Sequence, residues 1–191
     1  MRALLLAAAL LVGCAPALPP PRTTVVAAPR NDLAGLSNFA KVSLTLYRGA
    51  QPSREGFETL KRLGVRTVVN LRSKHSDREA LAGLGLVYVE LPSHPWEPRS
   101  DRVAQVLALA RDPAHAPVFV HCEHGADRTG YTVASYRIVE QGWDRDRALR
   151  ELRVFGFHSI WGNIPSFLAD LDARAMDERV RTTPPPEGQV L

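Results

Sequence analysis

The chain has 191 residues, of which 45% are hydrophobic and 23% charged, and its formal net charge at pH 7 is +4. This length suits one globular domain with an adequate hydrophobic core. The basic residues are scattered and are not interleaved with aromatic ones, so nucleic-acid binding is not indicated.

The N-terminus has a basic start followed by an apolar stretch from Ala3 to Val12. That stretch is shorter than the roughly 20 residues needed to cross a bilayer, and it predicts a secretory signal. Residues 11–14, Leu-Val-Gly-Cys, resemble the lipobox of bacterial lipoproteins. We therefore expect residues 1–13 to be a signal peptide and Cys14 to carry the lipid. The protein would then be anchored to a bacterial membrane on its extracytoplasmic side. The alternative is an ordinary signal peptide in which Cys14 has no role.

A proline-rich stretch follows the predicted signal. Residues 15–29 include five prolines and no aromatic residue, which is typical of an extended tether. We expect this tether to cover residues 14–38 and the folded domain to cover residues 39–177. The C-terminal residues 178–191 contain three consecutive prolines and are predicted to be a flexible tail.

Strand and helix patterns alternate along the folded part. The predicted strands cover residues 42–46, 65–71, 87–91 and 118–120. The predicted helices cover residues 57–63, 100–110, 131–140, 145–153 and 164–172. Such alternation predicts an α/β fold, a single domain whose central, mostly parallel sheet is flanked by helices.

The segment from His121 to Gly130 reads His-Cys-Glu-His-Gly-Ala-Asp-Arg-Thr-Gly. It joins a predicted strand to a predicted helix, where unpaired N–H groups and the helix dipole together can bind an anion. The thiol of Cys122 and the guanidinium of Arg128 would face that anion from the two ends of the loop. If Cys14 carries lipid, no second cysteine is left to form an internal disulfide with Cys122.

This loop resembles the signature loop of the cysteine-dependent protein tyrosine and dual-specificity phosphatases, which reads His-Cys, five residues, Arg, then Ser or Thr. Residues 46–52, 65–72 and 136–143 are similar to exported bacterial members of the dual-specificity group. The resemblance implies the protein tyrosine phosphatase fold and a phosphomonoester hydrolase without cofactor or metal. Its substrates would be proteins that carry phosphotyrosine, and also phosphoserine or phosphothreonine.

The resemblance also implies roles for the loop residues. Cys122 would be the nucleophile that forms a phosphocysteine intermediate, and Arg128 would bind two phosphoryl oxygens in the transition state. Thr129 would hydrogen-bond the thiolate. His121 would hold the loop, with a buried structural histidine as the alternative. The other residues expected to surround the phosphate are Glu123, His124, Gly125, Ala126, Asp127 and Gly130.

The general acid that protonates the leaving group has three candidates. Family members supply an aspartate from the loop before the preceding helix, and here residues 92–101 lack one at the usual early position. Glu97 lies nearest to that position, and we favour it. Asp101 falls in the first turn of the predicted helix. The alternative is that it is a surface residue whose negative charge complements the helix dipole. Asp127 directly precedes the loop arginine, as in the myotubularin-like phosphatases.

Glu123 and Asp127 make the rim of the loop acidic, which should repel multiply phosphorylated substrates and favours phosphoproteins. The alternatives are a phosphatase of phosphoinositides or inositol phosphates, a rhodanese-type sulfurtransferase, and a non-catalytic phosphate-binding module. Sulfur transfer would not require an arginine six residues after the cysteine, where Arg128 lies. A binding module would not require Cys122. The physiological substrate and the oligomeric state stay open.

Overall fold

The computed structural model describes residues 26–191. The predicted signal peptide and the predicted lipidation site Cys14 therefore lie outside the described residues. None of the helices within residues 26–191 has both the length and the apolar character needed to cross a lipid bilayer.

A six-stranded sheet runs through the middle of the described part in the order β1-β2-β5-β3-β4-β6. The strands are β1 (Ala40–Lys41), β2 (Leu46–Gly49), β3 (Thr67–Asn70), β4 (Val87–Glu90), β5 (Val118–His121) and β6 (Gln189–Val190). The four central strands are parallel, and the short edge strands β1 and β6 pair antiparallel with β2 and β4.

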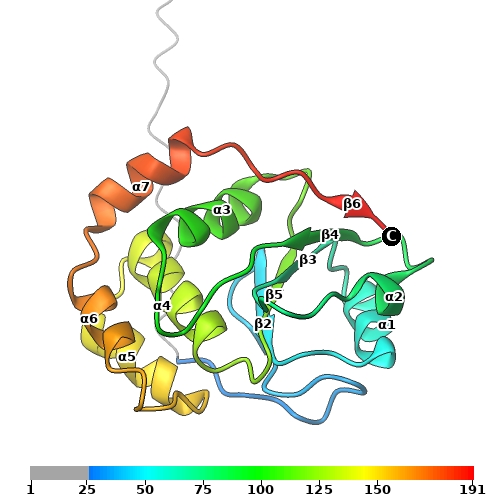
Figure 1. Ribbon diagram of the computed structural model, residues 1–191, viewed down its shortest axis with the longest axis horizontal. Coiled ribbons are helices and arrows are strands. Elements are labelled where there is room, and N and C mark those ends of the chain that lie inside the picture. Colours follow the sequence, from blue (N-terminus) through cyan, green and yellow to red (C-terminus); the bar gives the residue numbers. More distant parts are fainter. Residues whose placement is uncertain (1–25) are drawn as a thin grey trace, which may run out of the picture.

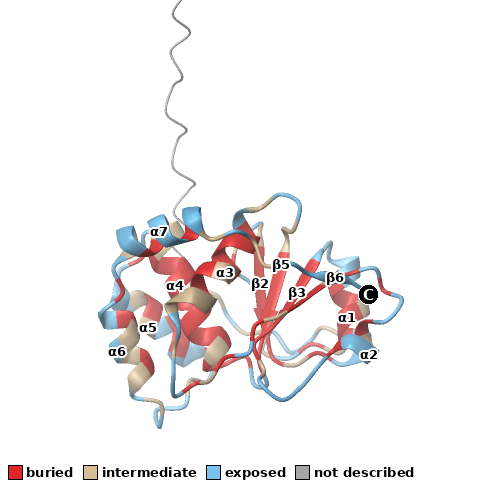
Figure 2. Cartoon of the chain, turned by 45° about the horizontal axis from the view of Figure 1, so that its top comes forward, coloured by how far each residue is buried: buried red, intermediate tan, exposed pale blue. Residues whose placement is uncertain are grey.

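Helices cover both faces of this sheet (Figure 1). One face carries α1 (Arg54–Arg62) and α2 (Arg78–Leu81). The other carries α3 (Ser100–Arg111), α4 (Arg128–Gln141), α5 (Arg145–Val154), α6 (Asn163–Ala169) and α7 (Ala173–Thr182). Each face buries its own hydrophobic cluster, and strands β2, β3 and β5 are buried throughout (Figure 2). This arrangement confirms the predicted α/β fold with a central, mostly parallel sheet.

Helix α4 lies at the centre of the larger layer, where it packs against the sheet, α3, α5, α6 and α7. Its residues 129–138 are all buried. Gly130 permits the close contact with α5, since a Cβ atom there would lie 2.3 Å from Leu152 Cδ1. The packing therefore fixes the start of α4 at the end of β5.

The predicted strand over residues 42–46 was wrong for all but its last residue, because residues 42–45 form the turn between β1 and β2 and only Leu46 belongs to a strand. The hydroxyl of Ser43 accepts hydrogen bonds from the N–H groups of Thr45 (3.1 Å) and Leu46 (3.0 Å). Such local side-chain bonds stabilise a turn in place of a sheet ladder. Leu44, which the alternation placed in the core, is 79% exposed.

Both ends of the folded part also differ from the predicted boundaries. Residues 178–191 are not a loose tail, since α7 continues to Thr182 and β6 extends the sheet beside β4. The N–H of Leu191 donates to Leu86 O at 3.0 Å. An edge strand offers unpaired backbone groups, and the C-terminal residues pair with them. At the other end, Leu36, assigned to the tether, is 4% exposed in the core.

Candidate active site

The loop of residues 122–127 joins β5 to α4 and begins at the carboxyl end of β5. Strand β5 lies between the parallel strands β2 and β3. Parallel α/β sheets bind ligands at the carboxyl ends of their strands. The predicted signature loop therefore lies where the fold is suited to hold a ligand.

Four consecutive carbonyl oxygens of this loop each accept a hydrogen bond from a group outside it. The bonds run from His121 Nδ1 to Cys122 O (3.2 Å), Gln51 N to Glu123 O (3.0 Å), Asn38 Nδ2 to His124 O (2.9 Å) and Arg48 Nη2 to Gly125 O (2.7 Å). These donors come from several separate segments of the chain, so the surrounding fold orients the peptide planes of the loop.

In a trans peptide the N–H group points opposite to the preceding carbonyl. The N–H groups of residues 123–126 therefore point toward the concave side of the loop. Within residues 26–191, no hydrogen bond with a protein acceptor uses these four N–H groups. Converging N–H groups at the N-terminus of a helix form an anion-binding nest.

Gly125 lies at the closest approach of this loop to the end of β2. Its φ is +69°, in the left-handed region that favours glycine. A Cβ atom at this position would lie 2.5 Å from the carbonyl carbon of Gly49. The glycine is therefore required by the packing of two backbones as well as by its own conformation.

The predicted nucleophile and phosphate ligand lie at the two ends of the loop. Cys122 is a free thiol, 2% exposed, and Arg128 is the first residue of α4. The guanidinium of Arg128 lies 3.5 Å from Leu71 O and 4.0 Å from a carboxylate oxygen of Glu123. The hydroxyl of Thr129 is buried and has no hydrogen-bond partner among the described residues, so it is free to bond to a thiolate or a ligand.

His121 contacts Asp77 in the buried interior, next to Cys122 in the chain. Its Nε2 lies 3.0 Å from Asp77 Oδ2, and its Nδ1 lies 3.2 Å from the carbonyl oxygen of Cys122. Both partners can accept a hydrogen bond from the ring. Burial raises the pKa of Asp77, but hydrogen bonds from His121 and Gln51 outweigh it and hold that pKa below its usual range.

A second buried group reaches the loop from β2. The guanidinium of Arg48 donates to Gly125 O, lies 4.0 Å from Glu151 and stacks on the ring of Phe155 at 3.6 Å. Burial lowers the pKa of Arg48 to about 10, with Glu151 opposing the shift, so it stays charged at neutral pH. Arg137 completes the cluster with hydrogen bonds of 3.1 and 2.9 Å to Glu151.

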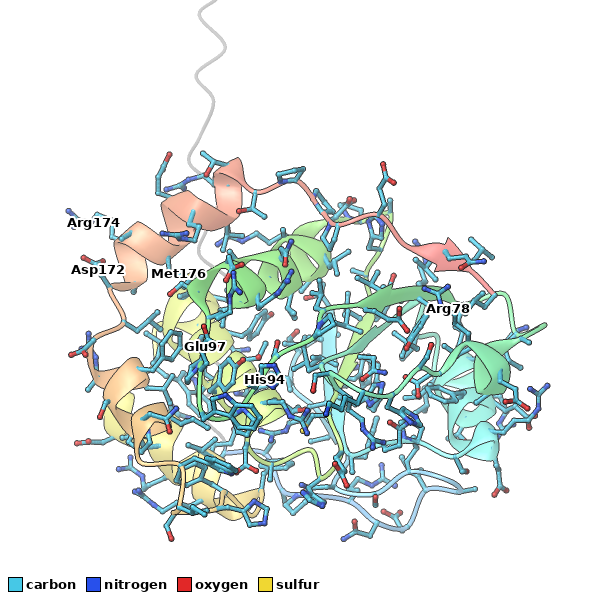
Figure 3. The ribbon with its side chains drawn as sticks, viewed as in Figure 1. Arg78, His94, Glu97, Asp172, Arg174 and Met176 are labelled. Atoms are coloured by element: carbon cyan, nitrogen blue, oxygen red, sulfur yellow. The ribbon has the colours of Figure 1, made fainter. Side chains whose placement is uncertain are left out.

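The three candidates for the general acid have different surroundings. A two-point hydrogen bond from Arg99, at 3.0 and 2.8 Å, holds the pKa of Asp101 below its usual range despite partial burial. Asp127 accepts from both the N–H (2.9 Å) and the ring (2.8 Å) of His158. Glu97 lies on the segment between β4 and α3 together with His94 (Figure 3). Its side chain is exposed and takes part in no hydrogen bond or ion pair found within residues 26–191.

The acidic rim is partly compensated by neighbouring cations. Glu123 lies 3.8 Å from Arg72 and 4.0 Å from Arg128, whereas Asp127 is hydrogen-bonded to His158. Neighbouring cations of this kind reduce the field of a carboxylate. The repulsion of multiply phosphorylated substrates is therefore weaker than the sequence suggested.

Comparison with known proteins agrees with this geometry. A family model described as "DSP-PTPase phosphatase fused to NAD+ Kinase" matches residues 30–163. The dual specificity protein phosphatase TpbA of Pseudomonas aeruginosa is 43% identical over 126 residues, which are 63% of this chain and 55% of TpbA. The inositol diphosphatase DSP3 of Arabidopsis thaliana is 31% identical over 127 residues, 62% of each chain. The chain thus spans about half the length of TpbA.

Solved structures show the same similarity. The crystal structure of P. aeruginosa TpbA in complex with pTyr has a TM-score of 0.70 and 30% identity, and the match covers 85% of this chain and 99% of that one. The catalytic core of Siw14 has a TM-score of 0.67 at 22% identity over 78% of this chain and 93% of that one, which shows the shared fold. The loop between β5 and α4, the family model and these relatives show that the chain belongs to the dual-specificity, protein-tyrosine-phosphatase-like phosphatases.

Proposed function

We propose that the protein hydrolyses phosphomonoesters of phosphotyrosine, and of phosphoserine or phosphothreonine, in proteins. One observation carries this proposal: four loop carbonyls are bonded from outside, so the N–H groups of residues 123–126 converge on the concave side of the loop. The thiol of Cys122 and the guanidinium of Arg128 lie at the two ends of that same loop.

The reaction would take place in two displacements. The Cys122 thiolate attacks phosphorus, the bond from phosphorus to the leaving oxygen breaks, and that oxygen receives a proton from the general acid. Water then attacks the phosphocysteine and releases phosphate. The loop N–H groups and Arg128 bind the equatorial oxygens, over which the charge of the transition state is spread. The Thr129 hydroxyl would hydrogen-bond the departing thiolate, and His121 would hold the loop through its contact with the Cys122 carbonyl.

For the general acid we propose Glu97. Asp101 is already bonded to Arg99, and this bond favours its ionised form. Both carboxylate oxygens of Asp127 are already taken up by hydrogen bonds with His158. Glu97 is exposed and carries no such bond, so its carboxyl group can turn toward a leaving group. Its position ahead of α3 is also close to that of the family's aspartate.

An aromatic surface beside Glu97 supports an aryl substrate. His94 stacks on Trp96 with ring centroids 4.4 Å apart, and Trp96 lies 6.1 Å from Trp161. Trp96 is 60% exposed, which leaves its ring available for contact. Aromatic rings pair favourably with other rings, so this surface suits a phosphotyrosine side chain. The TpbA structure with pTyr agrees with this choice.

The second candidate is hydrolysis of phosphorylated inositols. Two relatives named as inositol diphosphatases, DSP3 of A. thaliana and SIW14 of Saccharomyces cerevisiae, are 31% and 27% identical to this chain. The arginines beside Glu123 also weaken the objection to a multiply phosphorylated substrate.

For the location we propose export and membrane anchoring through a lipid on Cys14. The support is the N-terminal sequence, a basic start and a short apolar stretch that ends in Leu-Val-Gly-Cys. Labelling of the expressed protein with a radioactive fatty acid tests this proposal. Label that persists after Cys14→Ser would contradict it.

The activity is tested first with p-nitrophenyl phosphate. Cys122→Ser should abolish turnover while phosphate affinity is retained. Transfer of sulfur from thiosulfate to cyanide without phosphatase activity would instead support the sulfurtransferase. A phosphotyrosine peptide and an inositol polyphosphate compared at equal concentration then decide between the two substrate classes.

A further inference from the structure

Three potential metal ligands lie together at the rim of the phosphate-binding loop. A ligand atom from each of His124, Asp127 and His158 lies within 4.8 Å of the other two. The first two residues belong to the loop itself, and His158 belongs to the segment that follows α5. Within residues 26–191, this is the one group of three histidine, cysteine or carboxylate residues with that spacing.

Two of the three ligands are already held in place. Asp127 has only 11% of its side chain exposed, and its Oδ1 accepts from the N–H of His158 at 2.9 Å. Its Oδ2 lies 2.8 Å from Nδ1 of the same histidine. A cation between Asp127 Oδ2 and His158 Nδ1 would replace the hydrogen bond between these atoms. The bond from the backbone N–H of His158 to Asp127 Oδ1 would remain and orient the carboxylate.

The third ligand has room to close on the site. The side chain of His124 is 64% exposed, and its ring centroid lies 5.5 Å from that of His158. Ligands of a tetrahedral zinc ion lie about 2.0–2.2 Å from the metal, which puts them roughly 3.4 Å from one another. An exposed side chain reaches that spacing by rotating about its own bonds, without a change in the backbone.

We propose that His124, Asp127 and His158 bind a divalent transition-metal ion of the zinc type. Two imidazoles and one carboxylate suit zinc, cobalt, nickel or copper, whereas magnesium and calcium prefer sites made entirely of oxygen ligands. Glu123 lies 4.0 Å from Nε2 of His124 and is placed to orient that ring. Three protein ligands leave at least one coordination position for water or another ligand.

The site would control the neighbouring phosphate-binding loop, a consequence that rests on the proposed function. His124 and Asp127 lie between Cys122 and Arg128 in the chain, so a bound cation would add His124 to the existing contact between Asp127 and His158. It also cross-links the loop to the segment after α5.

Metal binding is tested in a protein that carries Cys122→Ser, because this change removes the thiolate as a competing ligand. Titration with Zn²⁺ by calorimetry, and with Co²⁺ by its visible absorption, should show one equivalent that depends on the site. His124→Gln and His158→Gln should each weaken that binding by at least about 10-fold. This readout needs no turnover, so failure of the proposed phosphatase activity would leave it intact.

A matched control is His115→Gln. His115 also lies 2.9 Å from an aspartate, Asp112, but that pair has no second histidine beside it. Zn²⁺ affinity should be the same in this variant as in its parent. Binding that is unaffected by His124→Gln and His158→Gln, in proteins with unchanged circular dichroism, would overturn the proposal. Absence of any Zn²⁺ binding to the parent would overturn it as well.

Discussion

Replacing Arg48 by methionine removes the guanidinium that holds the Gly125 carbonyl and keeps most of the apolar stem. The hydrogen bond is 2.7 Å long and fully buried, so no solvent replaces it. Glu151 keeps its two bonds from Arg137 and is not left unpaired. The main consequence is therefore that the peptide between Gly125 and Ala126 loses its fixed orientation. The N–H of Ala126 belongs to this peptide and points toward the concave side of the loop.

The size of the effect follows from that single bond. A hydrogen bond to a charged group contributes about 1.5–3 kcal/mol. If the loss appears wholly as weaker stabilisation of the transition state, kcat/KM falls by about 10- to 150-fold. Steady-state kinetics with p-nitrophenyl phosphate measure kcat/KM, and titration with vanadate measures the affinity for an oxyanion. Circular dichroism shows that the variant is folded.

Arg137→Met is the matched control. Arg137 belongs to the same buried cluster but donates to Val42 O and has no bond to the loop. It should lower thermal stability, because breaking a buried ion pair costs about 3–5 kcal/mol. The folded fraction should keep its kcat/KM. A folded Arg48→Met enzyme with unchanged kcat/KM and vanadate affinity would refute the reasoning.

Three further changes test other parts of the site. Gly125→Ala should lower both thermal stability and phosphate affinity, since its Cβ would lie 2.5 Å from Gly49 and its φ is +69°; a variant with the wild-type melting temperature contradicts this. Asp77→Asn tests the buried contact between Asp77 and His121 by urea unfolding at several pH values. The pKa of Asp77 is lowered, so its carboxylate stabilises the fold above about pH 3.9 and loses this effect as the pH falls through the folded-state pKa. The free energy of unfolding of Asp77→Asn should be lower than that of the wild type at pH 7, and the difference should disappear in strong acid. Equal free energies at pH 7 would argue against a stabilising contact. Glu97→Gln should slow aryl phosphates with poor leaving groups far more than those with good ones, and equal slowing excludes Glu97 as the acid.

The sequence alone predicted the parts of the site that are contiguous. Cys122, Arg128 and Thr129 lie within one short segment, so their spacing could be read directly. The residues that support the loop could not be found in this way, because they come from distant parts of the chain. Asp77 is 44 residues from His121, and Arg48 is 77 residues from Gly125. Only the folded arrangement of β2, β3 and β5 brings them together.

The predicted elements failed where local chemistry or length departs from the pattern. Hydrophobic alternation over residues 42–46 suggested a strand, but Ser43 bonds the backbone into a turn. The helix predicted over residues 164–172 ends at Ala169, and Asp172 caps α7 through the N–H of Arg174. The four-residue helix α2 and the two-residue strand β6 are too short to produce a periodic signal.

The central claim is that Cys122 attacks a phosphoryl group held by the loop that ends at Arg128. Rapid-quench trapping with ³²P-labelled p-nitrophenyl phosphate measures this most directly, followed by peptide mapping. The account predicts label on the peptide that contains Cys122, formed before steady-state turnover and absent from Cys122→Ser. Sustained phosphatase turnover by Cys122→Ser, or a covalent label on another residue, would contradict it.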